Sequence, residues 1–311
     1  MKISTIWNLT PLLKNDRDPA RAKFRRAIDK ATETFVRKWQ ARQDYLQAPA
    51  ALLEALQDFE RWHPFFAGGG HEGFYFMLRQ AQTQTDPTVK AGFNQSIEFI
   101  KKTENRINFF PIRLAKISAA AQKRFLSAPI LTPYRHFLER LFVEGKYTLT
   151  EAEEKIINLK ETPSHTHWVK MTSGFLTNEI REVLLENGRR AKKSFAEIMN
   201  LSNSQQKSGS DQAAQALNEI LEKHSDTAEA ELNAVLLNKK INDQLRGFPR
   251  PETSRHLADD IDTAVVDTLI KAVAGRFDLA KRYYRLKAKL LGVKQLAYHQ
   301  RNIPYGKIAK K

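Results

Sequence analysis

One stretch near the carboxyl end decides the fold: RFDLAKRYYRLKAKLLGV at residues 276–293, followed by YHQRNIPYG at residues 298–306. Its apolar side chains recur every three or four residues and form one stripe of a helix: Phe277, Ala280, Tyr284, Ala288 and Leu291. Cations line another face at four-residue steps: Lys281, Arg285 and Lys289. Asp278 can pair with Arg282 one turn later, and Gly292 is placed to end the helix in a left-handed conformation. The stretch is therefore predicted to be a basic amphipathic helix.

The same helical spacing recurs through the rest of the chain. It predicts helices that begin near Asp18 and Asp226 and helices at 49–62, 71–78, 89–107, 111–126, 133–142, 150–159, 176–185 and 213–222. The first of these carries an apolar stripe of Phe24, Ile28, Ala31, Phe35 and Trp39, and Thr150 with Glu153 is a capping-box signature for the helix at 150–159. A further helix, capped by Ser254, is expected to bury Leu257, Ile261, Val265 and Leu269. No segment shows the two-residue alternation of β-branched side chains that strands favour. The predicted fold class is all-α, a multi-helix array with little or no β.

A polar tract, SNSQQKSGSDQ at 202–212, is the most loop-like segment inside the chain. A length of 311 residues favours about two domains. We therefore expect an amino-terminal helical region at 1–201, a polar connection at 202–212 and a second helical segment at 213–311.

Composition narrows the chemistry that the chain can perform. The absence of cysteine excludes disulfides, thiolate catalysis and cysteine metal sites from this sequence. Lys and Arg number 51 against 35 Asp and Glu, a formal net charge of +16, which attracts phosphate or acidic partners through a salt-sensitive field. No run approaches the ~18 apolar residues of a membrane span, and the first residues lack a signal-peptide core, so a cytoplasmic location is expected.

Three groups of residues that contain histidine are candidates for metal or catalytic sites. His71-Glu72 begins like the zinc-peptidase motif His-Glu-x-x-His, but Tyr75 stands where the second histidine is needed. His165 and His167 have no third ligand nearby in sequence, so a surface or capping role is favoured. His256 could share a helical face with acidic residues, but carboxylates in a first helical turn are explained by the helix dipole: Asp259 and Asp260. No Gly-x-Ser-x-Gly or phosphate-loop motif occurs either.

Four basic clusters raise the possibility of a nucleic-acid partner: Arg21, Lys23, Arg25 and Arg26; Arg189, Arg190, Lys192 and Lys193; the stripe around Lys281; and Lys307, Lys310 and Lys311. Interleaved aromatics such as Tyr283 and Tyr284 would suit base stacking. Helical periodicity also explains Tyr284 as core and the lysines as a solvated face, and this second interpretation is preferred.

The opening stretch also carries a family resemblance. YYRLKAKLLGV at 283–293, followed by Leu296, Tyr298 and Pro304, resembles the segment that leads into the catalytic domain of the oligoendopeptidase F family of zinc metallopeptidases. His299 stands where that family usually has an aspartate, so the role of that acid is not carried over. The resemblance extends over essentially the whole chain. Its further matching segments are AELNAVL at 230–236, DQLRGF at 243–248, RHLADDI at 255–261, LTEAEEKII at 149–157, Trp168, and Trp7 with Leu9.

The resemblance implies the amino-terminal, substrate-enclosing lobe of a neurolysin-like oligopeptidase that acts on short peptides. In that family, zinc is held by the two histidines of His-Glu-x-x-His and a later glutamate, and the motif glutamate is the general base. No position of this sequence matches those residues, so we predict no catalytic, cofactor-binding or metal-ligating residue here and no activity for the chain alone.

Three explanations stay open: a gene fragment, one half of a split enzyme with a separately encoded catalytic half, or a non-catalytic relative. If a catalytic half is missing, the helices between 213 and 292 should expose apolar surface. The alternative function is a basic all-helical binding module for nucleic acid or an acidic protein, although nucleic acid is disfavoured. No membrane partner is expected.

Overall fold

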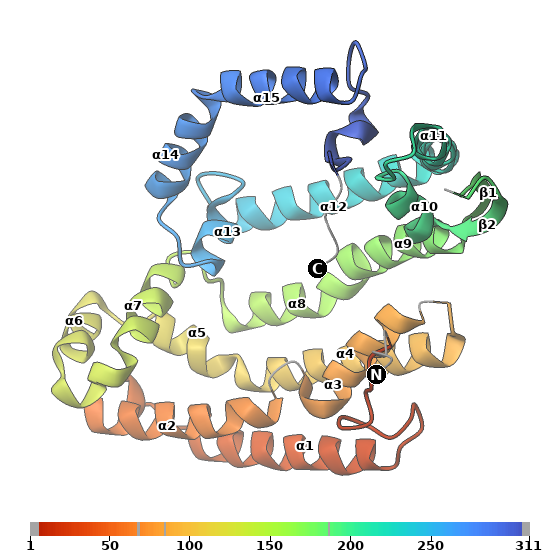
Figure 1. Ribbon diagram of the computed structural model, residues 1–311. Coiled ribbons are helices and arrows are strands. Elements are labelled where there is room, and N and C mark those ends of the chain that lie inside the picture. The colour runs from red at the N-terminus through yellow and green to blue at the C-terminus, as the bar shows by residue number, and fades with distance from the viewer. Residues whose placement is uncertain (1–5, 67–68, 84, 186, 307–311) are drawn as a thin grey trace. The chain divides into compact units, whose positions relative to one another are not determined.

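The computed structural model describes residues 6–306 apart from 67–68, 84 and 186, and this part of the chain is mainly helical (Figure 1). It also contains one short antiparallel hairpin, in which β1 Ile180–Leu184 pairs with β2 Arg190–Ser194. The predicted all-α class with little β is confirmed. Within the described ranges, no helix is both long and apolar enough to cross a bilayer.

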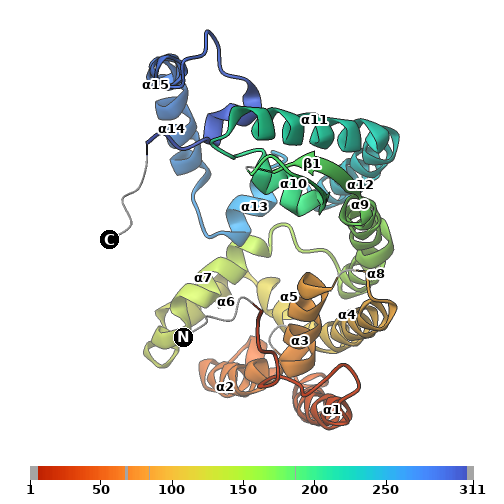
Figure 2. The same ribbon diagram turned by 45° about the vertical axis from the view of Figure 1, so that its right-hand side comes forward.

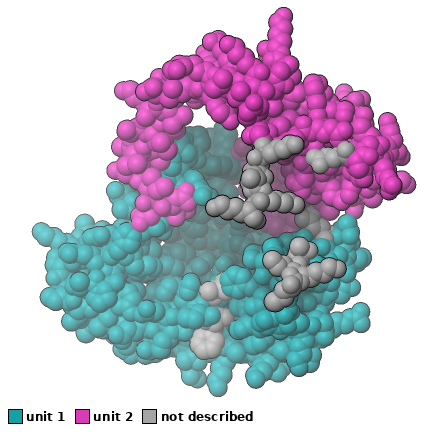
Figure 3. All heavy atoms as spheres, in the orientation of Figure 1, with its two compact units in different colours: residues 1–164, 239–257 teal, residues 165–238, 258–311 magenta. Residues whose placement is uncertain are grey.

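The chain divides into two compact units (Figure 3). Unit 1 contains residues 1–164 and 239–257, and unit 2 contains residues 165–238 and 258–311. The polar tract that was predicted to separate two regions, 202–212, lies inside unit 2.

Unit 1 is a stack of amphipathic helices. Their bounds are α1 Ala20–Trp39, α2 Pro49–Phe66, α3 Gly70–Gln82, α4 Pro87–Ile107, α5 Phe109–Ala115, α6 Ala119–Ser127, α7 Arg135–Glu144, α8 Glu151–Glu161 and α13 Thr253–Ala258. Short 3₁₀ turns lie at Asp44–Leu46 and Pro129–Tyr134. The predicted capping box at the start of α8 is confirmed, since Thr150 Oγ1 accepts a hydrogen bond from the Glu153 amide and the Glu153 carboxylate accepts one from the Thr150 amide.

The core of unit 1 is built around aromatic side chains. Phe110 is fully buried, and its ring centroid lies 5.4 Å from those of Phe35 and Tyr45 and 5.2 Å from that of Phe59. Such edge and tilted ring pairs add to the stabilisation that comes from the buried area itself. The predicted apolar stripe of α1 therefore does face a core.

The helix predicted at 111–126 is two helices in the structure, α5 and α6. Ser118 has an extended backbone, and its hydroxyl accepts a hydrogen bond from the Ala121 amide, so it caps a new helix. The helical spacing of apolar residues continues across Ser118, so the sequence pattern predicted one long helix and did not indicate the cap.

Unit 2 combines the hairpin with helices. These are α9 His167–Asn178, α10 Phe195–Leu201, α11 Lys207–Lys223, α12 Ser225–Arg246, which continues into unit 1, α14 Thr263–Ala274, α15 Phe277–Leu290 and the 3₁₀ turn η5 Tyr298–Asn302. The strand β1 packs on α10 and α11 (Figure 2). A small core forms there from Val183, Ile198, Ala213, Ala216 and Ile220.

The helix predicted at 176–185 is wrong, because α9 ends at Asn178 and β1 occupies residues 180–184. The sequence held the signal for a hairpin, an Asn-Gly pair at 187–188 between two runs of strand length. Gly188 has a φ of 77°, and Asn187 Oδ1 accepts a hydrogen bond from the Arg189 amide. The many charged residues on both strands concealed the alternation.

The predicted polar connection is only partly a loop. Helix α11 begins at Lys207, inside the tract, and Ser210 is fully buried with its hydroxyl donating to the Ser202 carbonyl at 2.7 Å. Gly209 lies against the Leu184 carbonyl of β1, where a Cβ would come within 3.4 Å. Small residues, whose composition is typical of a loop, thus lie where α11 packs on the hairpin.

The burial predicted at the carboxyl end is also wrong. The segment after Ser254 is broken by Asp260, which has a φ of 57°, and α14 then begins behind the cap Asp262. Three of the four residues expected in its core are exposed: Ile261, Val265 and Leu269. Gly292, with a φ of 68°, does end α15 in the left-handed conformation, as predicted.

Candidate functional site

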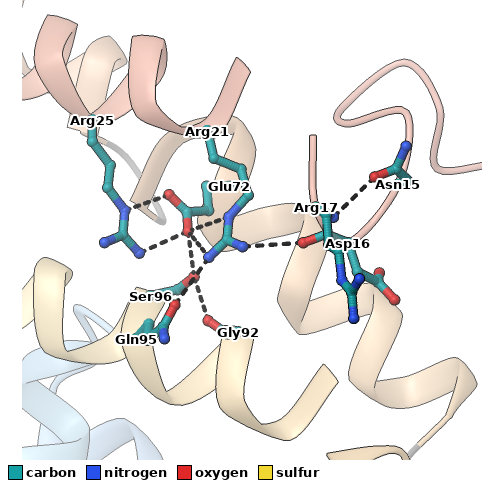
Figure 4. A network of polar contacts seen from close by, with 9 residues as sticks. All are labelled: Asn15, Asp16, Arg17, Arg21, Arg25, Glu72, Gly92, Gln95 and Ser96. Atoms are coloured by element: carbon teal, nitrogen blue, oxygen red, sulfur yellow. Dashed lines mark hydrogen bonds and ion pairs between the residues drawn. The ribbon is translucent and has the colours of Figure 1, made fainter. Parts of the chain in front are cut away.

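Glu72 of the incomplete zinc motif is a buried ion-pair partner. Its carboxylate accepts hydrogen bonds from Arg25 Nε at 2.7 Å and Arg21 Nη2 at 2.9 Å, both from α1, and Ser96 of α4 approaches at 3.4 Å (Figure 4). Burial by itself would raise the pKa of Glu72, but the two guanidinium groups outweigh it and hold the pKa below its usual range. Glu72 therefore joins α1, α3 and α4, and its oxygens are committed to cations.

The neighbours of Glu72 do not fit zinc. His71 stacks on the ring of Phe24, with centroids 4.6 Å apart. Tyr75, at the position of the missing histidine, donates its hydroxyl hydrogen to Asp16 at 2.7 Å, and burial together with this carboxylate raises its pKa to about 12. A carboxylate neutralised by two arginines and a single stacked imidazole do not form the donor set of a zinc site.

The other histidine candidates do not converge into a metal site either. His165 and His167 are exposed at the start of unit 2, and His256 is buried in α13. In the described ranges, no group of three or more His, Cys, Asp or Glu side chains could hold a metal ion. The zinc that the family implies has no ligand set among these residues, and the absence of catalytic residues stays a prediction.

Glu179 is a buried polar centre that the sequence did not reveal. Its carboxylate accepts hydrogen bonds from Lys223 at 2.6 Å, His224 at 2.7 Å and Arg181. Lys223 and His224, followed by Arg181, lower the pKa of Glu179 to about 2. Arg181 belongs to β1, whereas Lys223 and His224 lie at the end of α11, 44 and 45 residues along the chain from Glu179. No local sequence pattern predicts a pairing over that separation. The network fixes α9, β1 and α11 to one another.

His299, at the position where the family usually has an aspartate, also makes an internal pair. Its Nε2 lies 2.8 Å from Asp211 Oδ1 of α11. Asp211 is also bonded to Lys207, which is the main cause of its lowered pKa. This pair ties η5 to α11 within unit 2.

The four predicted basic clusters differ in how many of their cations form ion pairs within the chain. The first is partly used internally, since Arg21 and Arg25 bind Glu72. In the second, Lys193 pairs with Glu197 at 2.8 Å. The predicted pair between Asp278 and Arg282 is not formed, because Asp278 faces Arg276 at 3.7 Å. The fourth cluster, at 307–311, lies outside the described residues.

The candidate interaction surfaces are the exposed apolar faces of three helices, α12, α14 and α15, each considered by itself. Within the described residues, α12 and α14 bury no side chain, although both carry regular apolar rows. Leu236 on α12 is 59% exposed, Leu269 on α14 is 62% exposed and Phe277 on α15 is 56% exposed. Further large apolar side chains are exposed on these helices: Leu232, Leu237, Ile241, Leu245, Val265, Ile270, Val273, Leu279, Tyr283, Leu286 and Leu290. Exposed apolar rows of this kind are typical of helices that bind another protein.

Comparison with known proteins shows which family this chain resembles. Residues 113–173 match the sequence model described as oligopeptidase F. The oligoendopeptidase F homologue of Borreliella burgdorferi is 23% identical over 310 residues, which cover 97% of this chain and 49% of the relative. The chain is a relative of the oligopeptidase F family over that family's amino-terminal region. The matched residues contain two of the segments that carried the resemblance, 149–157 and Trp168.

Two further matches agree with this relationship. The group B oligopeptidase PepB of Streptococcus agalactiae is 20% identical, over 93% of this chain and 47% of its own length. The crystal structure of oligoendopeptidase-F from Enterococcus faecium superposes with a TM-score of 0.77 at 16% identity, covering 91% of this chain and 55% of that structure, and so shows the shared fold. This chain therefore spans about half the length of the curated relatives that it matches.

Proposed function

We propose that this chain forms the amino-terminal, substrate-enclosing part of a zinc-dependent oligopeptidase and acts with a catalytic half that carries His-Glu-x-x-His. The observation that carries the proposal is the combination of a family relationship over about half of each relative with regular, exposed apolar faces on α12, α14 and α15. Helices that keep a complete apolar row without a core of their own are suited to packing against a further domain.

The division of labour follows from the side chains present. Zinc on the catalytic half would polarise the peptide carbonyl and activate water. The described residues of this chain provide no set of ligands for that ion, and their proposed role is structural. The aromatic core around Phe110 and the ion pairs of Glu72 stabilise unit 1, which would then form part of the wall that encloses short, unfolded peptides.

The alternative, a basic module that binds nucleic acid, is favoured by the net charge of +16. Two observations weigh against it. Arg21 and Arg25 of the first basic cluster are occupied by Glu72, and the exposed faces of α12 and α14 are aliphatic, which phosphate and bases do not cover. Steep salt dependence of DNA or RNA retention by the purified chain would support this alternative instead.

The test uses hydrolysis of internally quenched peptides. The 311-residue chain is purified alone and is also co-expressed with a polypeptide from the same genome that carries His-Glu-x-x-His and continues the family resemblance. We expect no chelator-sensitive hydrolysis by the chain alone, and hydrolysis that chelators abolish when both halves are present. Chelator-sensitive cleavage by the purified chain alone would contradict the proposal, and so would a correctly assembled pair that cleaves no peptide.

A further inference from the structure

The hollow beside α15 is bordered by positive charge. It has a volume of ≈ 700 Å³ and lies between α15 and residues 293–301. Its cationic lining residues are Lys281, Arg285, Lys289, Lys294 and Arg301, and no Asp or Glu is among the described residues that line it. The first three follow one another at single helical turns, which places their Cα atoms about 6 Å apart along the axis.

These cations differ from the paired cations of α12 because they have no acidic partner among the described residues. Arg246 is bound to Glu154, with Nη2 2.7 Å from Oε2, and Lys239 lies 2.5 Å from Asp243. Among described residues, no carboxylate lies within 4.0 Å of Lys281, Arg285 or Lys289. Like charges one turn apart repel, so this row disfavours the isolated helix and is relieved by an anionic ligand.

Apolar side chains are interleaved with the charges. Tyr284 and Val293 line the hollow together with Leu296 and Tyr298. Tyr298 is 77% exposed, and the Arg301 guanidinium lies over its ring at 3.8 Å from the centroid. A ligand that fills the hollow must therefore offer both anionic and apolar groups.

We propose that this surface, formed by α15, residues 293–297 and η5, binds an acidic polypeptide segment of a partner protein, with carboxylates alternating with apolar side chains. A helix with Glu at every fourth position repeats its carboxylates about every 6 Å, and a strand with Glu at every second position repeats them about every 6.8 Å. Both spacings match the row of Lys281, Arg285 and Lys289. The inference concerns the charge chemistry of a surface that the isolated chain already presents, and it does not depend on zinc chemistry.

Other occupants fit less well. Nucleic acid would use the cations and tyrosines but would leave Val293 and Leu296 uncovered. A second copy would bring one row of uncompensated cations against another. A flat anionic bilayer suits a convex apolar face, whereas this surface is hollowed between α15 and η5.

The test measures fluorescence anisotropy of a labelled helical peptide with Glu at every fourth position and Leu between, added to the purified chain. The Glu→Gln version of the peptide, a single-stranded DNA of equal charge, and vesicles containing phosphatidylserine are compared under the same conditions. The decisive variant is Lys281→Glu with Arg285→Glu. Its matched control is Arg189→Glu with Arg190→Glu on the hairpin, which changes the net charge equally. Circular dichroism verifies that both variants keep their helix content.

We expect the acidic peptide to bind about tenfold more tightly than its Gln version, and its affinity should fall as the salt concentration rises. The α15 variant should bind the acidic peptide about tenfold more weakly than the natural chain, whereas the hairpin control should change by less than about twofold. Equal loss in the control would overturn the proposal. Tighter binding of DNA or of the vesicles than of the acidic peptide would also overturn it. The salt series and the Gln-peptide comparison use the natural chain, so they test the proposal even if the α15 variant fails to fold. Equal binding of the acidic peptide and its Gln version would overturn the proposal. Because no catalytic half is present, failure here leaves the proposed peptidase function unaffected.

Discussion

Helices α1 and α14 carry similar apolar rows, but the two rows have different surroundings. On α1, Phe35 and Trp39 are buried among the aromatic rings of unit 1, whereas on α14, Val265 and Leu269 are both 62% exposed. The charged residues of the two regions also differ. Arg25 of α1 has a buried carboxylate partner, whereas Lys281 of α15, the helix after α14, has no such partner among the described residues. Periodicity thus shows which side chains share a face, but only the rest of the fold determines what covers that face.

The largest effect expected from this comparison concerns the core. Phe110→Ala removes a fully buried ring from unit 1 and should lower the free energy of unfolding by about 3–5 kcal/mol. Leu269→Ala on α14 should change it by less than about 0.5 kcal/mol, since that side chain already faces water. Urea unfolding followed by tryptophan fluorescence measures both. Similar losses for the two variants would show that α14 is packed in solution.

The next effect concerns the buried charge of Glu72. Glu72→Gln leaves two arginines without their anion and should cost about 3 kcal/mol at pH 7, near the lower end for a buried pair because Arg21 and Arg25 keep partial access to water. Because the folded-state pKa of Glu72 is lowered, its stabilisation is present above the ordinary glutamate pKa and is lost as pH falls through the lowered value.

The difference between natural chain and variant should therefore shrink at acid pH, which unfolding midpoints measured at several pH values would show. Glu98→Gln, at an exposed pair with Lys102, is the control and should have a much smaller effect. A pH-independent difference would mean that Glu72 acts through packing and not through its charge.

A smaller effect is expected at the cap of α8. Thr150→Ala removes the side-chain acceptor of the Glu153 amide and should cost about 1 kcal/mol. Thr150→Ser keeps the acceptor and serves as the matched control, with thermal unfolding as the measurement. If both substitutions cost the same, the β-branched methyl group and not the hydrogen bond stabilises this helix start.

These residues also show how far the sequence could predict the structure. The Thr150 box, the left-handed Gly292 and the α1 stripe depend on neighbours within about one or two turns, and all three were predicted correctly. The Asn187-Gly188 turn was equally local but was missed because charged residues occupied the strands. The partners of Glu72 and Glu179 come from distant segments, so no spacing rule could find them.

The candidate surface was predicted only through the family resemblance. From periodicity alone, Val265 and Leu269 were placed in a core, and the structure shows the opposite. The resemblance, in contrast, implied that helices between 213 and 292 would expose apolar area, and α12, α14 and α15 do so. A local pattern cannot distinguish a face that its own chain covers from one that a partner covers.

The measurement that tests the central claim most directly combines apolar-dye fluorescence with sedimentation velocity on the purified 311-residue chain. The account predicts strong dye binding and concentration-dependent association, both reduced in a variant with Leu236→Ser, Leu269→Ser and Phe277→Ser that keeps its helix content. A monomer that binds no dye, with the variant indistinguishable from it, would contradict the claim that these helices present an uncovered interface.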